Sequence, residues 1–287
     1  MKSCFFVSDI HGDTVKYRKL FRAVLQHRPA ALFLGGDLLP HGFGLLNSPG
    51  NDRGDFVKDF IGEELLKLRR ELDSDYPEIF VILGNDDARL EEAAVIELAG
   101  NNLWHYMHMK TITFTGRPVY GYAHTPPSPF TLKDWERYDV SRYVDPGCIA
   151  PSDGRVTVPV SDRELRYGTI AEDLEKLAGD KDLTDAICLF HAPPYKSNLD
   201  RAGLDGRVID HVPLDVHVGS IAVQRFIQTR QPRLTLHGHI HESARLTGSW
   251  CDKIGRTICY TAAHDGPELA LVKFDPDNPD KAVRELL

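Results

Sequence analysis

Three short apolar runs in the first third of the chain each end at a small residue followed by a polar side chain, and helical patterns separate them. The three ends are Ser8-Asp9, Gly36-Asp37 and Gly84-Asn85. Alternating strands and helices favour neighbouring parallel strands joined by right-handed crossovers. The carboxyl ends of such strands meet at one edge of the sheet, where open sheets of this kind bind ligands. The order of elements therefore predicts an α/β fold with a polar site at that edge.

The segments between these runs carry helical spacing. One helix is expected from Val15 to the residues before Pro29, because helices tend to end ahead of a proline. Residues 56–72 place apolar side chains three and four apart, which is typical of an amphipathic helix. A third helix, over 88–99, stops at Gly100-Asn101. A loop rich in Gly, Pro and Asn is expected over 40–54.

Regular patterns return after a long irregular stretch. Residues 111–123 alternate as a strand does, but 125–168 shows no sustained periodicity and interleaves aromatic with charged residues. We interpret 125–168 as an insertion, either a lid over the site or a surface excursion packed on its own aromatics. Further strands are expected at 186–190, 234–236, 256–262 and 269–274, and helices at 169–178 and 220–229. Nothing indicates a second domain, so one domain over 1–287 is predicted.

Composition limits the classes of function. The net charge of −8 disfavours a protein that holds nucleic acid mainly through phosphate contacts, and a small phosphorylated substrate remains compatible because metal ions can supply positive charge. Five scattered cysteines without a C-x-x-C pair favour a reducing compartment. The chain has no apolar run long enough to span a bilayer, and too few apolar residues before Asp9 for a signal peptide. A cytoplasmic location without membrane contact is expected.

Residues of the types that commonly bind metal ions follow five of the expected strands. Asp9 and His11 are two apart, so both point to the same side of an extended backbone. Imidazole combined with carboxylate suits Mn, Fe, Zn or Ni better than Ca or Mg. The candidate ligands are Asp9, His11, Asp37, Asn85, His191, His239 and His241. Seven ligands exceed one tetrahedral ion, and they fit two ions that share a bridge, about 3.5–4 Å apart.

The joint pattern resembles the calcineurin-like metallophosphoesterases. That family shows Asp-x-His, Gly-Asp, Gly-Asn followed by a carboxylate or histidine, a later single His, and Gly-His-x-His. The matching residues are Asp9-Ile10-His11, Gly36-Asp37, Gly84-Asn85-Asp86-Asp87, His191 and Gly238-His239-Ile240-His241. The resemblance implies a four-layer αββα sandwich of two mixed sheets flanked by helices. It further implies a hydrolase of a phosphomonoester or phosphodiester, in which a metal-bridging hydroxide attacks phosphorus.

The resemblance also implies a ligand set for each ion. By this likeness, Asp9, His11 and His241 hold one ion, Asn85, His191 and His239 hold the other, and Asp37 bridges both. Manganese is the expected metal, with Fe, Zn or Ni as alternatives. A non-catalytic scaffold that binds a protein partner, or a metal-dependent nuclease, is the alternative function.

Two departures from the family pattern are informative. Where many members have a histidine that protonates the leaving alkoxide, this chain has Asp86, a carboxyl normally ionised at neutral pH. Either Asp86 acts as the acid with a raised pKa, or another donor such as His124 serves, or the leaving group needs little help. We expect His124→Ala to lower turnover without loss of metal, and Asp87 to orient a metal ligand. Asp52-Arg53-Gly54 comes too late for the run that marks Ser/Thr protein phosphatases, which disfavours that class.

Other residues are weaker candidates. Arg201 and Arg207 follow His191 in the chain and are considered for binding substrate phosphate, although a surface role is the simpler alternative for each. His217 and His264 are placed in loops that could face the site, and His237 is interpreted as a structural or supporting residue.

Overall fold

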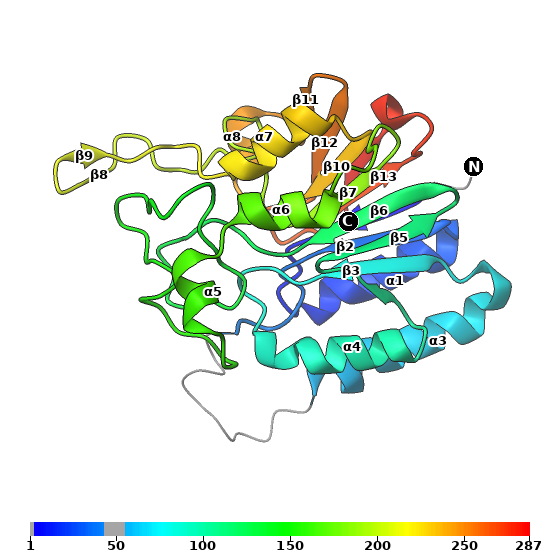
Figure 1. Cartoon of the computed structure of the whole chain (residues 1–287). Helices are drawn as coiled ribbons and strands as arrows, with labels where there is room; N and C mark the ends of the chain where they lie inside the picture. Colours follow the sequence, from blue (N-terminus) through cyan, green and yellow to red (C-terminus); the bar gives the residue numbers. More distant parts are fainter. Residues whose placement is uncertain (1–2, 43–54) are drawn as a thin grey trace.

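Two six-stranded mixed sheets lie face to face with helices on their outer surfaces in the computed structural model (Figure 1). The structure describes residues 3–42 and 55–287, so most of the loop expected over 40–54, with Asp52-Arg53-Gly54, lies outside the described residues. The layers confirm the predicted four-layer sandwich. None of the described helices combines the length and hydropathy needed to cross a bilayer.

The first sheet has the order β14-β13-β1-β2-β3-β4. Strands β1 to β4 run parallel to one another, as the alternating pattern predicts, whereas β13 and β14 pair antiparallel at one edge. The strands are β1 (Cys4–Val7), β2 (Ala31–Gly35), β3 (Glu78–Ile82), β4 (His105–Tyr106), β13 (Ala270–Phe274) and β14 (Val283–Leu286). Strands β1, β2 and β3 consist almost wholly of buried apolar residues, as expected of strands covered on both faces.

The second sheet has the order β11-β12-β10-β7-β6-β5. Its middle strands β6, β7, β10 and β12 are parallel, and β5 and β11 form antiparallel edges. The strands are β5 (Lys110–Phe114), β6 (Arg117–Tyr122), β7 (Ile187–Phe190), β10 (Leu234–His237), β11 (Cys251–Ile254) and β12 (Thr257–Thr261). Side chains from both sheets form one core between them, in which Phe33 stacks on Phe80 and meets Phe114 edge-on.

Helices cover both outer faces. Against the first sheet lie α1 (Thr14–His27), α3 (Glu63–Leu72) and α4 (Glu92–Gly100), and against the second lie α6 (Ile170–Ala178) and α7 (Ile221–Arg230) (Figure 1). The side chain of Thr169 caps α6 by accepting from Glu172 N–H, as its capping-box sequence predicts. Ser220 caps α7 in the same way.

The expected helix over 56–72 differs in its first half. Residues Phe56–Gly62 form a π-helix before α3 begins. Phe56 stacks on Phe60, and both rings pack on Tyr17 of α1. Apolar spacing alone does not distinguish this wider turn from an α-helix.

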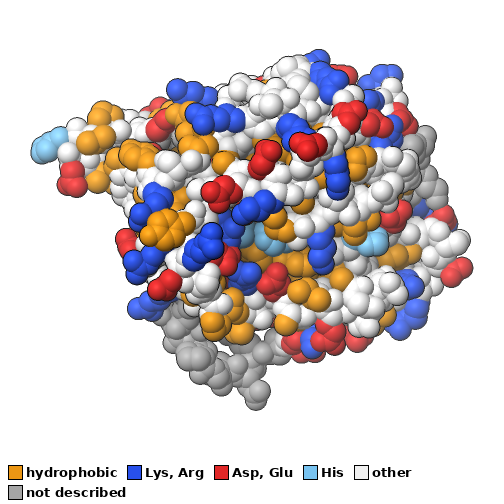
Figure 2. All heavy atoms as spheres, in the orientation of Figure 1, with side chains coloured by type: hydrophobic (Ala, Val, Ile, Leu, Met, Phe, Trp, Pro, Cys, Tyr) orange, Lys and Arg blue, Asp and Glu red, His pale blue; other side chains and the backbone are white. Residues whose placement is uncertain are grey.

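The stretch 125–168 contributes no strand to either sheet and contains one short helix, α5 (Asp162–Tyr167). It is packed on buried aromatics, including Trp135 and Tyr138. A two-stranded hairpin, β8 (Val208–Ile209) and β9 (Val212–Pro213), interrupts the loop expected after residue 195 and projects from the body (Figures 1 and 2). A short helix, α8 (Ser243–Thr247), follows His241.

Candidate metal centre

The carboxyl ends of five parallel strands, three from one sheet and two from the other, carry the candidate ligands. In the first sheet, Asp9 and His11 follow β1, Asp37 follows β2 and Asn85 follows β3; in the second, His191 follows β7, and His239 and His241 follow β10. Backbone bonds tie these ends together, because Asp9 N–H donates to Gly36 O and Gly238 N–H donates to His191 O. The edge predicted from strand order is therefore where the residues meet.

Four of these side chains sit on backbone in the left-handed region. The φ angles are 56° at Asp9, 50° at His11, 53° at Asp37 and 76° at His239. Non-glycine residues adopt this conformation seldom and at a cost, and such residues concentrate at functional sites. The sharp turns bring each side chain round to the edge between the sheets.

Two groups of potential ligand atoms share one carboxylate. Asp9, His11, Asp37 and His241 place ligand atoms within 4.8 Å of one another, and so do Asp37, His191 and His239. Asn85 joins the second group, with its Oδ1 atom 3.2 Å from Nε2 of His191. All seven predicted residues are thus brought together, with Asp37 common to both groups.

The donor atoms face one another in a way that calls for a cation. The Nδ1–H group of His191 donates to Gly35 O at 2.7 Å, so the lone pair of a neutral ring is on Nε2. That Nε2 atom faces oxygens of Asn85, at 3.2 Å, and of Asp37, at 3.3 Å. Acceptors that converge on acceptors without a donor need a proton or a metal ion between them.

The first group has the same character. His11 donates its Nδ1–H to Asp86 at 3.0 Å, and its Nε2 atom lies 3.2 Å from Nε2 of His241. The buried Oδ2 atom of Asp9 has no hydrogen-bond partner among the described residues. A Cβ added to Gly84 would lie 2.3 Å from Asp37 Oδ1, so the site leaves no room for a side chain there. These residues fit a pair of divalent ions.

Charge in the cluster is compensated between carboxylates and imidazoles. Burial opposes a charge on His191, but the carboxylates of Asp37 and Asp9 outweigh it and raise its pKa to about 9. Burial likewise opposes a charge on Asp37, yet His191 and His11 hold its pKa well below the usual range. For His239, burial and the neighbouring His191 lower the pKa to about 3. The site therefore favours neutral His239 beside ionised carboxylates, the state in which these groups bind metals.

Asp86 contacts the site through both its backbone and its side chain. Its N–H donates to Asp37 Oδ1 at 2.8 Å, and its carboxylate accepts from His11. The same carboxylate oxygen accepts from Nδ1 of His41, a residue that sequence reasoning missed. The only sequence signal for His41 is its place four residues after Asp37, in the loop that follows β2.

Asp87 is fully buried beneath the ligands. Its carboxylate accepts from the backbone N–H groups of Leu38, Leu39 and Gly84. Burial and the charge of Asp37 raise its pKa to about 7. Asp87 thus joins the loop after β2, which carries Asp37, to the loop after β3, which carries Asn85. Its role in orienting a ligand stays a prediction.

His124 lies in an aromatic group under the insertion. Its ring centroid is 4.9 Å from that of His108 and 5.5 Å from those of Trp135 and Tyr122. None of its ring contacts within residues 3–42 and 55–287 is with a candidate ligand. Its role in catalysis stays a prediction.

Four of the five weaker candidates have side-chain partners in the structure. Arg201 pairs with Asp205, His217 with Asp200 at 2.8 Å, and His264 with Glu268 at 3.1 Å. His237 donates from Nδ1 to Ala192 O at 2.8 Å, and its Nε2 accepts from the Thr235 hydroxyl, which is the supporting role expected of it.

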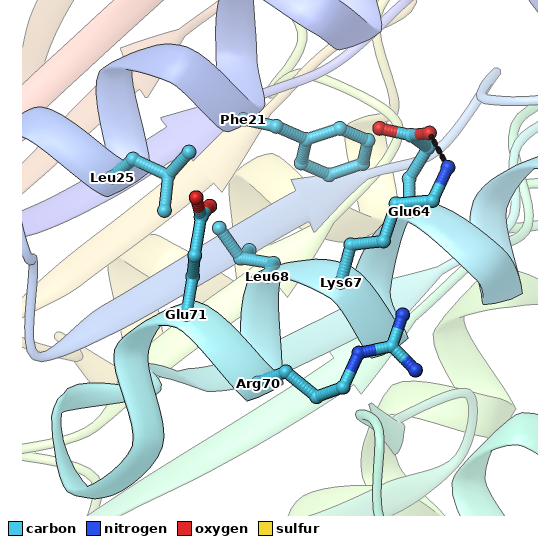
Figure 3. Close-up of a pocket in the computed structure, with 7 residues that line it drawn as sticks. All are labelled: Phe21, Leu25, Glu64, Lys67, Leu68, Arg70 and Glu71. Carbon is cyan, nitrogen blue, oxygen red and sulfur yellow. Dashed lines mark hydrogen bonds and ion pairs between the residues drawn. The ribbon is translucent and has the colours of Figure 1, made fainter.

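A cavity of about 450 Å³ lies elsewhere, between α1 and α3 (Figure 3). Its apolar part is formed by Phe21, Leu25 and Leu68, and the charged side chains around it include the ion pair of Glu64 and Lys67. It contains no histidine and shares no residue with the metal centre. The cavity supplies no chemistry to the candidate site.

Comparisons with known proteins bear on the family and the fold of the chain. The family model of the calcineurin-like phosphoesterases matches residues 4–243. The protein TT1561 of Thermus thermophilus is 18% identical, with a TM-score of 0.55 over 99% of this chain and 98% of its own. The phosphopantetheinyl hydrolase PptH from Mycobacterium tuberculosis is 10% identical, with a TM-score of 0.51 over 91% and 89%. A dimetal phosphatase from Danio rerio is 13% identical, with a TM-score of 0.50 over 94% of each chain. None of the curated proteins matches the chain.

Proposed function

Because the chain belongs to the calcineurin-like phosphoesterase family, we propose that it is a metal-dependent phosphohydrolase that cleaves a phosphomonoester or a phosphodiester. The observation that carries the proposal is the shared carboxylate: Asp37 belongs to both groups of potential ligands. Two ions joined by one bridging carboxylate are the arrangement used for in-line displacement at phosphorus. The substrate we propose is a small phosphorylated molecule.

The ligand sets follow the two groups of atoms. We assign Asp9, His11 and His241 to one ion, Asn85, His191 and His239 to the other, and Asp37 to both. Manganese suits this mixture of imidazole, carboxylate and amide, as do Fe, Zn and Ni. When bound, such a pair activates a water molecule as the nucleophile and neutralises charge on the phosphoryl oxygens.

The chain's own residues hold this arrangement in place. The hydrogen bond from Nδ1–H of His191 to Gly35 O turns Nε2 of His191 toward the site. The hydrogen bond from Nδ1–H of His11 to Asp86 likewise turns Nε2 of His11 toward the site. Asp87 fixes the backbone on either side of Asp37 and Asn85 through its bonds to Leu38, Leu39 and Gly84. Little reorganisation is then needed when an ion and a substrate bind.

Hydrolysis of two simple esters tests the proposal. Full-length protein reconstituted with Mn²⁺ is expected to hydrolyse p-nitrophenyl phosphate or bis(p-nitrophenyl) phosphate, and chelator-treated protein is expected to do so only after Mn²⁺ is restored. Protein that holds two equivalents of metal yet cleaves neither ester would contradict the proposal and favour a scaffold that binds a protein partner.

A nuclease is the second hydrolytic alternative. The net charge of −8 disfavours a nuclease, because proteins that bind phosphate backbones generally use basic surfaces. Cleavage of single- or double-stranded DNA or RNA, without cleavage of either small ester, would favour the nuclease instead.

A further inference from the structure

The candidate metal centre combines fully buried side chains with partly exposed ones. The side chain of His191 is 0% exposed, and those of Asp37 and Asp9 are nearly as buried. By contrast, the side chain of His241 is 35% exposed and that of Asp86 is 24% exposed. We call the part of the site that includes His11, His241 and Asp86 the open side. A ligand can reach the buried carboxylates past it.

His41 lies at this open side. Its side chain is 70% exposed, and its Nδ1–H donates to the Asp86 carboxylate. Its ring stacks on that of His11, with centroids 5.1 Å apart and an angle of 30° between the planes. The ring is therefore in contact with a candidate ligand while its outer edge meets solvent.

The backbone around His41 is fixed by close approaches on both sides. Gly12 packs against Pro40, the residue before His41, and a Cβ on Gly12 would lie 2.6 Å from Pro40 Cγ. Gly42 donates its N–H to Asp86 O at 2.9 Å, and a Cβ on it would lie 2.9 Å from that oxygen. The position of His41 is thus fixed, because Asp86 holds both its ring and the backbone of the next residue, Gly42.

We propose that His41 contacts the ester group of the substrate and that Asp86 is its positioning residue. The inference rests on the proposed function, because it takes the phosphoryl group of the substrate to bind among the buried ligands. We take the rest of such a substrate to extend through the open side, past the ring of His41. With Nδ1 engaged by Asp86, Nε2 is the polar atom of His41 that remains for this contact.

A contact between His41 and the ester group would distinguish the binding of an organic phosphate ester from that of inorganic phosphate. Inorganic phosphate lacks the group that extends past the open side, so its binding does not require His41. A phosphate or phosphonate that carries an organic group touches the ring. His41 is then a determinant of specificity for the ester group, and Asp86 acts through it and through His11.

Binding of phenylphosphonate and of inorganic phosphate to the Mn²⁺-loaded protein, measured by calorimetry, tests the proposal. His41→Ala is expected to lower the affinity for phenylphosphonate at least five-fold, while the affinity for phosphate and the metal content stay within two-fold of wild type. Gly42→Ala displaces His41 but keeps its imidazole, and it is also expected to lower the affinity for phenylphosphonate. His105→Ala is the matched control, since His105 is a partly exposed histidine of β4 that pairs with Glu78.

Three results would overturn the inference. They are unchanged binding of phenylphosphonate by His41→Ala, an equal loss of affinity for both ligands, and a loss of bound metal, which would make His41 a ligand instead. Because binding is measured without turnover, the result is distinct from that of the hydrolysis assay. A wild type that binds both ligands but cleaves no ester would reject the proposed function and leave the role of His41 to be decided by the same comparison.

Discussion

Oδ2 of Asp37 lies 3.3 Å from Nε2 of His191, so a residue that follows β2 of one sheet contacts a residue that follows β7 of the other. Both side chains are buried, and the pKa of each is displaced in the direction that favours an ion pair: that of Asp37 is lowered and that of His191 is raised to about 9. The contact joins the two sheets at the candidate metal centre, where Asp37 is the carboxylate common to both ligand groups.

Replacement of Asp37 by Asn is expected to abolish tight binding of metal. The amide keeps the shape of the side chain but removes the negative charge shared by both ligand groups. We expect bound Mn²⁺ after dialysis, measured by inductively coupled plasma mass spectrometry, to fall to less than a tenth of the wild-type content. Asp205→Asn, at an exposed residue paired with Arg201, is the control and should retain its metal. Full metal content in Asp37→Asn would reject the shared carboxylate.

Asp87→Ala is expected to lower the free energy of unfolding by about 3 kcal/mol or more, because buried N–H groups of Leu38, Leu39 and Gly84 lose their acceptor and each costs roughly 1–3 kcal/mol. Urea denaturation of chelator-treated protein measures the change without a contribution from bound metal. Asp59→Ala, on the exposed face of the π-helix, should change the free energy by less than about 0.5 kcal/mol. A loss no greater than that of the control would show that Asp87 does not hold the two loops.

Much of the site could be predicted because it lies where buried strands end. Apolar runs such as those of β1 and β2 have a strong sequence signal, and the polar residues directly after them inherit a known place at the edge of the sheet. The family resemblance adds the pairing of ligands, which spacing alone does not give. The structure accordingly brings together all seven residues that were singled out.

Contacts between distant segments left no such signal. His41 meets Asp86 only because the loops after β2 and β3 are adjacent in the fold, and no local pattern marks that pairing. Edge strands β11 and β14 are half-exposed and mix polar with apolar residues, so they resemble loops in sequence. The turn of the β8–β9 hairpin places Asp210 and His211 at positive φ without a glycine, which hides its usual signature.

His124 is expected to make a contribution to stability that is lost as the pH drops below about 6.5. Burial, and then the positive charge of Arg137, hold the pKa of His124 well below 6.5 in the folded chain. The unfolded chain binds a proton to this ring near pH 6.5 and the folded chain does not, so acid favours unfolding and stability is complete above that pH. Urea denaturation at pH 7.5 and pH 5.5 should show a smaller pH dependence for His124→Phe than for wild type. Equal dependence would mean that protonation of His124 is not linked to unfolding.

The insertion is expected to depend on a buried ion pair between Lys133 and Glu136, whose side chains are almost fully buried. Lys133 also donates to Ser128 O at 2.9 Å, and Ser128 donates its N–H to Glu136 at 2.7 Å. Lys133→Met leaves the Glu136 charge buried without its partner, so it should cost about 3–5 kcal/mol of unfolding free energy.

The double variant Lys133→Met/Glu136→Gln should cost less than Lys133→Met alone, because the amide keeps an acceptor for Ser128 and removes the uncompensated charge. Lys67→Met is the control, since its pair with Glu64 is exposed and should contribute about 1 kcal/mol or less. Urea denaturation gives the free energies, and limited proteolysis shows whether cleavage within 125–168 increases with them. If the double variant is as unstable as Lys133→Met, the cost comes from lost packing of the lysine and not from the unpaired charge.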